Sequence, residues 1–253
     1  MTINRDNDVE LSGGEGPMDA SETLKAIEEA LASRHLTMRG VVRLKAGDPL
    51  WPEGYPSPPQ SDGTCTIVLI GHLGGAFWQT FWQEKSDTTN PLDSWSRNIL
   101  DSIARQIGAT LIMPNDRPYQ PFQQWALQSN RVFRSPLGLL IDPEAGLWHA
   151  FRGALVLPGS LASPLEAAGS DMDQIQSPCL SCREKPCLSA CPVNAFSDDA
   201  PMKVDACRGH LAAQQPPNCL EIGCRARDAC PVGIKYRYSP AQIAFHMAAF
   251  AGR

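Results

Sequence analysis

Residues 179–192 of this 253-residue chain are CLSCREKPCLSACP, and residues 219–231 are CLEIGCRARDACP. Together with Cys207, these two segments contain eight of the nine cysteines of the sequence. The first four follow the spacing C-x2-C-x4-C-x3-C-Pro, and the last cysteine is again followed by proline. Closely spaced cysteines let several thiolates converge on one metal centre, and proline, which has no N–H and a fixed φ, ends each loop. The stretch therefore predicts a thiolate-ligated metal site.

Two sets of four cysteines that each end in Cys-Pro resemble the pattern of bacterial ferredoxins with two 4Fe–4S clusters. In that pattern the fourth cysteine of each run binds the other cluster. The pattern implies a first cluster on Cys179, Cys182, Cys187 and Cys230, and a second on Cys191, Cys207, Cys219 and Cys224. The ligands of the second cluster are less regularly spaced than those of the first.

Zinc and disulfides are the alternatives to iron–sulfur clusters for these cysteines. Four-cysteine zinc sites also use C-x2-C pairs, but zinc gives no reason for two Cys-Pro endings or for eight ligands. Disulfides require an oxidising compartment, and residues 1–18 are polar and glycine-rich, without the apolar core of a signal peptide. Iron–sulfur clusters are the preferred interpretation.

Composition and charge narrow the class of protein. The hydrophobic fraction of 43% is ordinary for a globular protein, and no run approaches the ~20 apolar residues that span a bilayer. The net charge is −5, with 22 basic and 27 acidic residues, which argues against a stable complex with nucleic acid. Residues 177–253 alone are basic, with 9 Lys and Arg against 6 Asp and Glu. This charge is suited to offset anionic clusters or to dock an acidic redox partner, and ordinary surface charge explains it equally well. We expect a cytoplasmic protein without a membrane segment.

The rest of the chain predicts alternating helices and short strands. Apolar spacing and capping residues predict helices over residues 20–35, 91–107, 121–128 and 240–253. Apolar runs predict strands over 66–70, ending at Gly71, and over 109–113. Two more expected strands, 138–141 and 147–157, are joined by the turn Asp142-Pro143-Glu144-Ala145-Gly146 as a hairpin. This order indicates an α+β fold with a mixed or antiparallel sheet.

The expected organisation has five parts. Residues 1–18 form a flexible leader, 19–158 an α+β domain, 159–176 a linker, 177–238 the two-cluster ferredoxin-like module, and 239–253 a C-terminal helix. Composition sets these boundaries, because Pro, Gly and Ser are concentrated between the periodic segments.

Residues 136–158, PLGLLIDPEAGLWHAFRGALVLP, resemble a segment of the CblC-type cobalamin-processing enzymes. They are also similar to a segment of the epoxyqueuosine reductases, which carry a two-cluster ferredoxin module after the same kind of domain. Corrinoid reductive dehalogenases share this layout. The resemblance implies a nitroreductase-like α+β domain that binds a corrinoid, followed by the cluster module. It implies cofactor contacts at Gly146, Trp148 and Arg152.

The chain departs from these families at two positions. Asp142-Pro143 stands where the CblC-type segment has His-Pro, and Arg227 stands where the second cysteine motif of the epoxyqueuosine reductases has its middle cysteine. The catalytic acid region of the epoxyqueuosine reductases is not recognisable either. These departures shift the expected function from queuosine chemistry toward corrinoid handling or another reduction.

Three functions are therefore kept open. The first is an iron–sulfur reductase that passes electrons from two clusters to a corrinoid, for cobalamin reduction or removal of its upper ligand. The second is a ferredoxin-type electron carrier without a substrate of its own. The third is a flavin-dependent or epoxyqueuosine-reductase-like reductase, with FMN as the second choice of cofactor. The first and third require a small-molecule ligand, and all require a redox donor protein.

Overall fold

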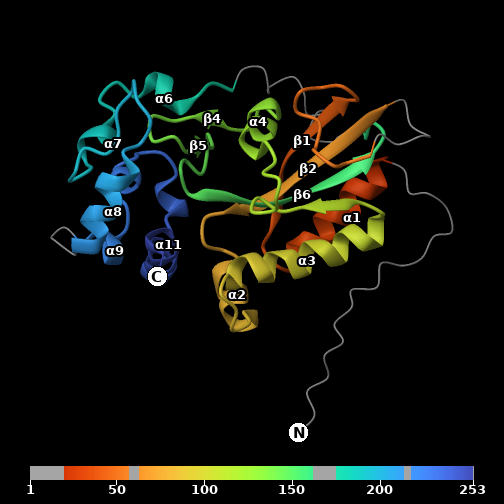
Figure 1. Ribbon diagram of the computed structural model, residues 1–253, viewed down its shortest axis with the longest axis horizontal. Helices are drawn as coiled ribbons and strands as arrows, with labels where there is room; N and C mark the ends of the chain where they lie inside the picture. The colour runs from red at the N-terminus through yellow and green to blue at the C-terminus, as the bar shows by residue number, and fades with distance from the viewer. Residues whose placement is uncertain (1–19, 57–62, 162–174, 214–217, 253) are drawn as a thin grey trace, which may run out of the picture.

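The computed structural model describes residues 20–56, 63–161, 175–213 and 218–252. A four-stranded sheet with its covering helices forms one part of the molecule, and the cysteine-rich segment lies at one end of it (Figure 1). The leader and most of the linker expected from the sequence lie outside the described residues. Within the described ranges, no helix combines the length and apolar character needed to cross a membrane.

The sheet is antiparallel and has the strand order β1-β2-β6-β3. Its members are β1 (Thr37–Lys45), β2 (Thr64–Leu73), β6 (His149–Pro158) and β3 (Thr110–Ile112). In β2, every residue from Thr64 to His72 is buried, as expected of a central strand covered on both faces. The expected α+β fold with an antiparallel sheet is confirmed.

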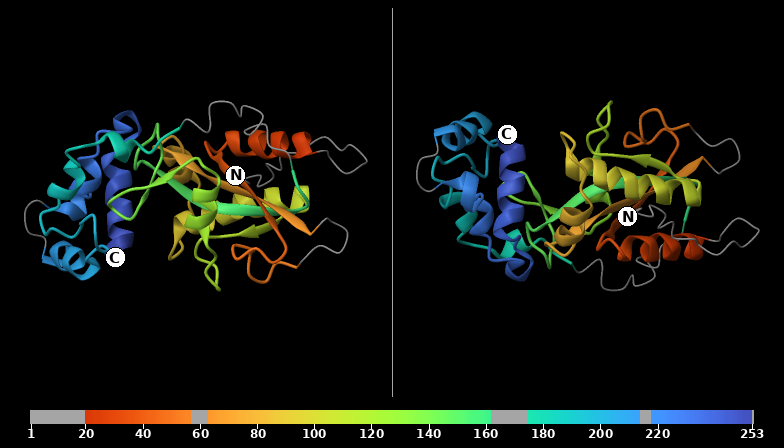
Figure 2. Two further views of the ribbon diagram at one scale, coloured as in Figure 1. Left: turned by 90° about the horizontal axis from the view of Figure 1, so that it is seen from above. Right: turned by 90° about the horizontal axis from the view of Figure 1, so that it is seen from below.

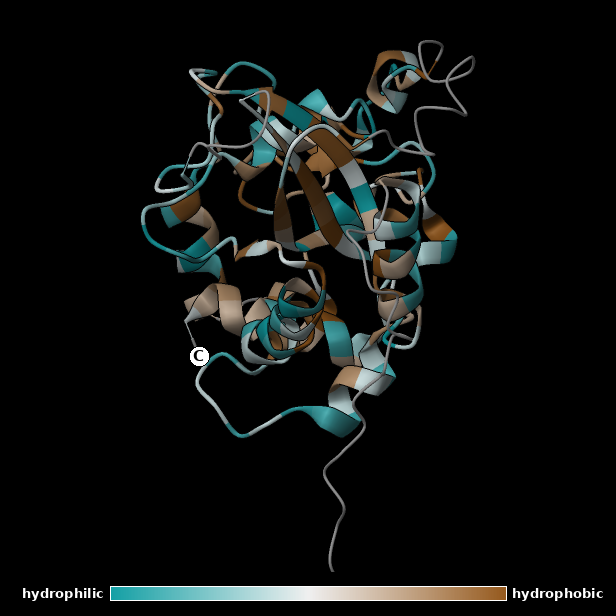
Figure 3. Cartoon of the chain, turned by 90° about the vertical axis from the view of Figure 1, so that its right-hand side faces the viewer, coloured by the Kyte–Doolittle hydropathy of each residue, from teal (hydrophilic) through white to brown (hydrophobic). Residues whose placement is uncertain are grey.

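Helices cover both faces of this sheet (Figure 3). Alternate side chains of β2 therefore enter two different cores. Val68 and Ile70 pack with α1 (Ala20–Ala32) and α3 (Pro91–Ile107), while Ile67 and Leu69 pack with α4 (Phe122–Gln128). Between β2 and α3, the short helix α2 (Trp78–Glu84) adds Phe81 to the first core. This alternation follows from the two-residue period of a strand.

Several expected elements are confirmed, and others are corrected. Helix α3 spans the expected residues, with Pro91 in its first turn and Gly108 in the left-handed conformation (φ 67°) at its C-cap. The predicted end of the strand at Gly71 is wrong, because β2 continues through a bulge to Leu73. The sequence pattern does not predict strand β1.

The predicted hairpin is also corrected. Asp142 and Gly146 do exchange backbone hydrogen bonds of 2.9 Å across the turn. However, β5 (Leu140–Ile141) pairs with β4 (Phe133–Arg134) and not with β6. The turn therefore leaves the sheet and extends toward the cysteine-rich segment.

The cysteine-rich segment is built from short helices and loops packed around its own cysteines. Its elements are α6 (Pro178–Ser181), α7 (Pro186–Ser189), α8 (Val204–Ala213), α9 (Cys219–Ile222), α10 (Arg225–Asp228), η2 (Ile234–Tyr236) and α11 (Pro240–Ala251). As the sequence predicts, Ser239 caps α11 by accepting a hydrogen bond from the Gln242 N–H. Helix α11 lies between the other helices of this segment and the sheet (Figure 2). There, Phe245 contacts Trp78 and Phe81, with ring centroids 5.3 and 5.6 Å apart.

Two glycines join the turn to the loop that follows Cys230. A Cβ on Gly233 would lie 2.1 Å from the carbonyl oxygen of Ala145, and a Cβ on Gly146 would lie 2.2 Å from that of Val232. Both glycines have positive φ, 74° and 60°, which non-glycine residues rarely adopt. The two backbones therefore approach each other as closely as they do because neither residue has a side chain.

We expect Gly233→Ala to destabilise the protein by about 2 kcal/mol, because the new methyl group meets a backbone carbonyl that can move only with its turn. Urea denaturation followed by circular dichroism measures this change. Gly252→Ala is the matched control, since Gly252 has nearly the same φ, 75°, but no atom near its Cβ position. Equal effects of the two substitutions would show that only backbone strain matters at Gly233.

Candidate functional site: two cysteine groups and an adjacent cavity

The structure gathers the eight C-terminal cysteines into two groups. A small cavity is lined by Cys179, Cys182, Cys187 and Cys230, together with prolines that precede or follow three of them. Chain segments about forty residues apart thus meet at this cavity. Of the other four cysteines, Cys207 lies in α8, Cys219 begins α9 and Cys224 is the N-cap of α10, while Cys191 follows α7.

The electrostatics of the thiols follows the same division. Burial and then the negative charges of Cys230, Cys179 and Cys182 raise the pKa of Cys187. Burial and then the negative charges of Cys224, Cys191 and Cys219 raise the pKa of Cys207 to about 11. Each of these two thiols thus interacts with the other three members of its own group. Four thiols this close together lose their protons readily only when a cation, such as a metal ion, lies between the sulfurs.

Metal binding by these groups stays a prediction. Among the residues that the structure describes, no three His, Cys, Asp or Glu side chains form a group that could hold a metal ion. The thiol chemistry and the shared cavity are nevertheless compatible with iron–sulfur ligation.

A larger cavity of about 330 Å³ lies where the sheet meets the cysteine-rich segment. Leu140, Leu147, Ala150 and Phe151 contribute to an apolar wall, and the cavity is partly open to solvent. Its polar lining comes from four separate segments of the chain: Gln123, His149, Arg152, Arg227, Tyr238 and His246. A volume of this size is at the lower end of the range for small-molecule sites.

Arg227 connects the second cysteine group to this cavity. It lies on α10, three residues after Cys224, and donates two hydrogen bonds, of 3.0 and 2.6 Å, to the Leu147 carbonyl oxygen. Its guanidinium carbon lies 4.5 Å from the ring centroid of Trp148 and 4.6 Å from that of Tyr238. The arginine that replaces an expected cysteine therefore contacts the sheet side of the interface.

The three predicted cofactor contacts occupy different places. Arg152 lines the larger cavity. Trp148 lies behind it, in a smaller adjoining cavity that also includes Cys224 and His246. Gly146 packs against Val232 and is not among the described residues that line either cavity. Cofactor binding by these residues stays a prediction.

The histidines near the cavity were not predicted from the sequence. His72 is fully buried on β2, and His149 and His246 line the cavity from β6 and α11. Burial, followed by the charges of nearby arginines, lowers the pKa of His149 to about 4 and that of His246 to about 4. No sequence signal could have found this group, because its members are far apart in the chain and have no ligand spacing.

His149 gives a pH dependence to stability. Its pKa is about 4 in the folded protein against an ordinary value of 6.5, so the unfolded chain takes up the proton first as the pH falls. We expect its contribution to stability to be complete above pH 6.5 and to fall by about 1 kcal/mol between pH 7.5 and 5.5. Urea titrations at both pH values would measure this slope. His149→Gln should reduce the slope by this amount and leave the part that His72 and His246, whose pKa values are also lowered, contribute; an unchanged slope would contradict the assignment.

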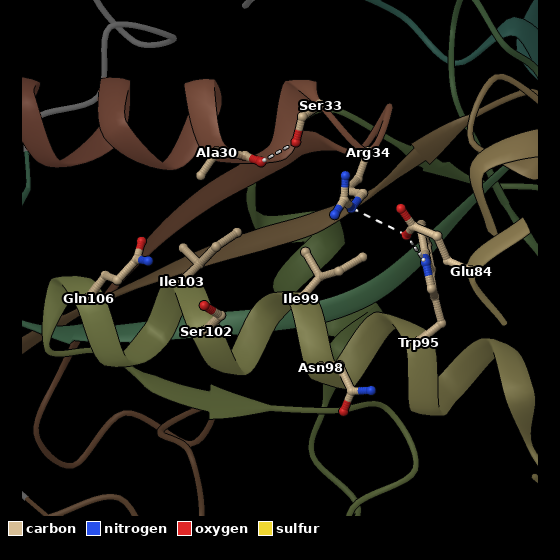
Figure 4. Close-up of a pocket in the computed structure, with 10 residues that line it drawn as sticks. All are labelled: Ala30, Ser33, Arg34, Glu84, Trp95, Asn98, Ile99, Ser102, Ile103 and Gln106. Carbon is tan, nitrogen blue, oxygen red and sulfur yellow. Dashed lines mark hydrogen bonds and ion pairs between the residues drawn. The ribbon is translucent and has the colours of Figure 1, made fainter. Parts of the chain in front are cut away.

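A second cavity, of about 310 Å³, lies between α1 and α3 (Figure 4). Its charged groups already have partners: Arg34 is 3.3 Å from Glu84, which also accepts a hydrogen bond of 2.8 Å from the Trp95 indole N–H. No cysteine lines it among the described residues. It is therefore the weaker candidate for a redox site.

Comparisons with known proteins give the fold but not the family. No family model matches the sequence, and no curated protein matches it. The structure of selenomethionine-labelled epoxyqueuosine reductase is similar with a TM-score of 0.50 and 13% identity, over 87% of this chain and 68% of that chain. At this identity the similarity concerns the fold alone, and it agrees with the fold expected from the sequence.

Two further structures have TM-scores of 0.49. One is the B12-trafficking protein CblC of C. elegans, a homologue of human MMACHC, at 16% identity over 91% of this chain and 92% of that chain. The other is epoxyqueuosine reductase with a modified tRNA-Tyr stem loop, at 14% identity over 85% of this chain and 66% of that chain.

Proposed function

We propose that this protein is an iron–sulfur reductase that supplies electrons to a small molecule bound in the cavity beside Arg152. One observation carries the proposal: Arg227, on the helix that follows Cys224, forms part of the cavity wall. Cys224, a member of the second cysteine group, lines a smaller cavity together with the same Arg227. In this proposal, the cysteine-rich segment and the sheet act as one redox unit.

In this proposal the eight cysteines hold two 4Fe–4S clusters. Cys179, Cys182, Cys187 and Cys230 would hold the first, and Cys191, Cys207, Cys219 and Cys224 the second. When bound, such clusters supply single electrons at low potential. The chain itself shields the ligands, since Cys191, Cys219 and Cys230 are buried. Burial and mutual charge raise the pKa of several of the thiols, so that metal binding and thiol deprotonation are coupled.

A redox donor protein would dock near the first cysteine group. Leu180, next to Cys179, is 76% exposed, and Ile234, close in sequence to Cys230, is 57% exposed. Exposed apolar side chains next to a redox centre are suited to brief contact with a partner. The same observation supports the second candidate function, a ferredoxin-type carrier whose cavity holds no substrate.

A corrinoid is the first choice of ligand and FMN the second. The resemblance of residues 136–158 to corrinoid enzymes supports the first choice. The cavity volume of about 330 Å³ encloses only part of a corrinoid, and the remainder would extend through the open side. The apolar wall suits a flat ring system, and the arginines suit a phosphate, which both cofactors carry.

Anaerobic purification, with iron, sulfide, zinc and organic cofactor measured on the same sample, tests the proposal. We expect about eight iron and eight sulfide per chain, and a base-off spectrum when cob(II)alamin is added. Zinc alone, or no metal, would overturn it. Full iron content in a protein that retains no corrinoid or flavin and does not bind added cob(II)alamin would favour the electron carrier instead.

A further inference from the structure

The cavity beside Arg152 has an unusual charge balance. Two arginines line it, Arg152 from β6 and Arg227 from α10, and no Asp or Glu is among the described residues that form its wall. Burying cationic groups is costly unless an opposite charge or a full set of hydrogen bonds compensates them. A ligand that brings negative charge into the cavity would therefore compensate the two arginines.

Arg152 is poorly compensated by the protein. Its side chain is only 15% exposed, and the carboxylate paired with it, that of Asp93, is 3.8 Å away and is itself 44% exposed. Its Nε is buried without a hydrogen-bond partner. Burial lowers the pKa of the guanidinium, which shows that the site disfavours its charge.

Arg227 is held by neutral groups. It contacts the Leu147 carbonyl oxygen and the rings of Trp148 and Tyr238, which orient the guanidinium but bring no negative charge. This differs from Arg39, whose guanidinium lies 2.5 Å from the Asp142 carboxylate. The two cavity arginines thus lack the close anionic partner that Arg39 has.

The histidines beside the cavity carry no charge that would compensate the arginines. Besides burial, the charge of Arg152 lowers the pKa of His72, and the charges of Arg152 and Arg227 lower that of His246. The imidazoles are therefore neutral at neutral pH. Among the described residues that line the cavity, Arg152 and Arg227 are therefore the charged side chains.

We propose that this cavity is a binding site for a small oxyanion, a carboxylate or phosphate group of the ligand, held between Arg152 and Arg227. Planar guanidinium groups bind such oxygens through paired hydrogen bonds. The site requires both the sheet and the cysteine-rich segment, because each supplies one arginine. The inference rests on the proposed function in taking this cavity as the ligand site, but free anions test the two arginines without a corrinoid or flavin.

Calorimetric titration of the anaerobically purified full chain tests the site. The probes are inorganic phosphate, succinate, and succinamide as the neutral counterpart of succinate. We expect phosphate or succinate to bind and succinamide not to bind, and the stronger of the two anions identifies the oxyanion preferred. We expect Arg152→Gln and Arg227→Gln each to weaken binding about tenfold or more, the loss of one charge-assisted hydrogen bond.

The matched control is Arg105→Gln, which removes an arginine that is exposed, paired with Asp101, and not part of the cavity wall. It should bind the anions as the unmodified chain does. The proposal fails if succinamide binds as tightly as succinate, if neither anion binds, or if all three variants behave alike. The comparison of succinate with succinamide stands even if Arg227→Gln misfolds. Failure of this site with full iron content would leave the reductase proposal intact.

Discussion

Replacing Cys230 with serine is expected to reduce iron from about eight to about four atoms per chain, because one cluster would lose a ligand that no neighbour can replace. Cys230 is buried and lines the small cavity with the three cysteines of residues 179–187. Iron and sulfide assays on anaerobically purified protein measure the loss, and electron paramagnetic resonance of the reduced protein should show one cluster signal instead of two interacting ones.

Cys65→Ala is the control for this experiment. Cys65 is the one cysteine outside residues 179–230 and is fully buried within β2. Its substitution should lower stability through the lost packing but leave the iron content unchanged. An unchanged iron content in the Cys230→Ser protein would show that Cys230 is not a ligand. The expected division of the eight cysteines into two sets of four ligands would then be wrong.

Replacing Arg39 with methionine is expected to destabilise the protein by about 3–5 kcal/mol, because it leaves Asp142 as a buried carboxylate without its ion-pair partner. The Arg39 Nη2 donates to Asp142 Oδ2 at 2.5 Å, and both side chains are 9% exposed. The pair joins β1 to the turn at residues 142–146. Urea denaturation followed by circular dichroism measures the change.

A double-mutant cycle with Asp142→Asn gives the control. If the ion pair is the cause, the double variant should be less destabilised than the two single variants combined. Additive effects would instead assign the loss to packing of the arginine side chain.

The pH dependence should agree with this cycle. Burial alone would raise the pKa of Asp142, but the hydrogen bonds from the Ala145 N–H and from Arg39 outweigh it and lower the pKa below 3.8. This contribution to stability is complete above the unfolded value and is lost as the pH falls through the folded value. It is therefore separate from the His149 effect, which appears at higher pH.

Local features of the chain made several elements predictable. Helix α3 was predicted over its whole length, because Pro91 begins it and apolar residues follow one face. The β-branched run predicts strand β2, but the strand extends to Leu73, beyond the end that this run predicts. Gly71 breaks the apolar run at the position of a bulge, where the strand bends but continues to pair.

Strand β1 was missed because its residues have no clear strand signal. Its sequence, TMRGVVRLK, includes a glycine and three cations, and it becomes a strand by pairing with β2. The hairpin was wrong for a related reason. The turn chemistry at Asp142 was recognised, but the partner of β5 is β4, which lies earlier in the chain.

The sequence by itself determined the cysteine motifs, the main helices and the central strand. These depend on residue spacing and on interactions within a few residues of the chain. Only the tertiary structure decided that Arg152, Arg227 and His246 share a cavity, and that Asp142 is paired with Arg39. Such groups lie on separate elements, and the packing of the sheet against the cysteine-rich segment brings them together without leaving a pattern along the chain.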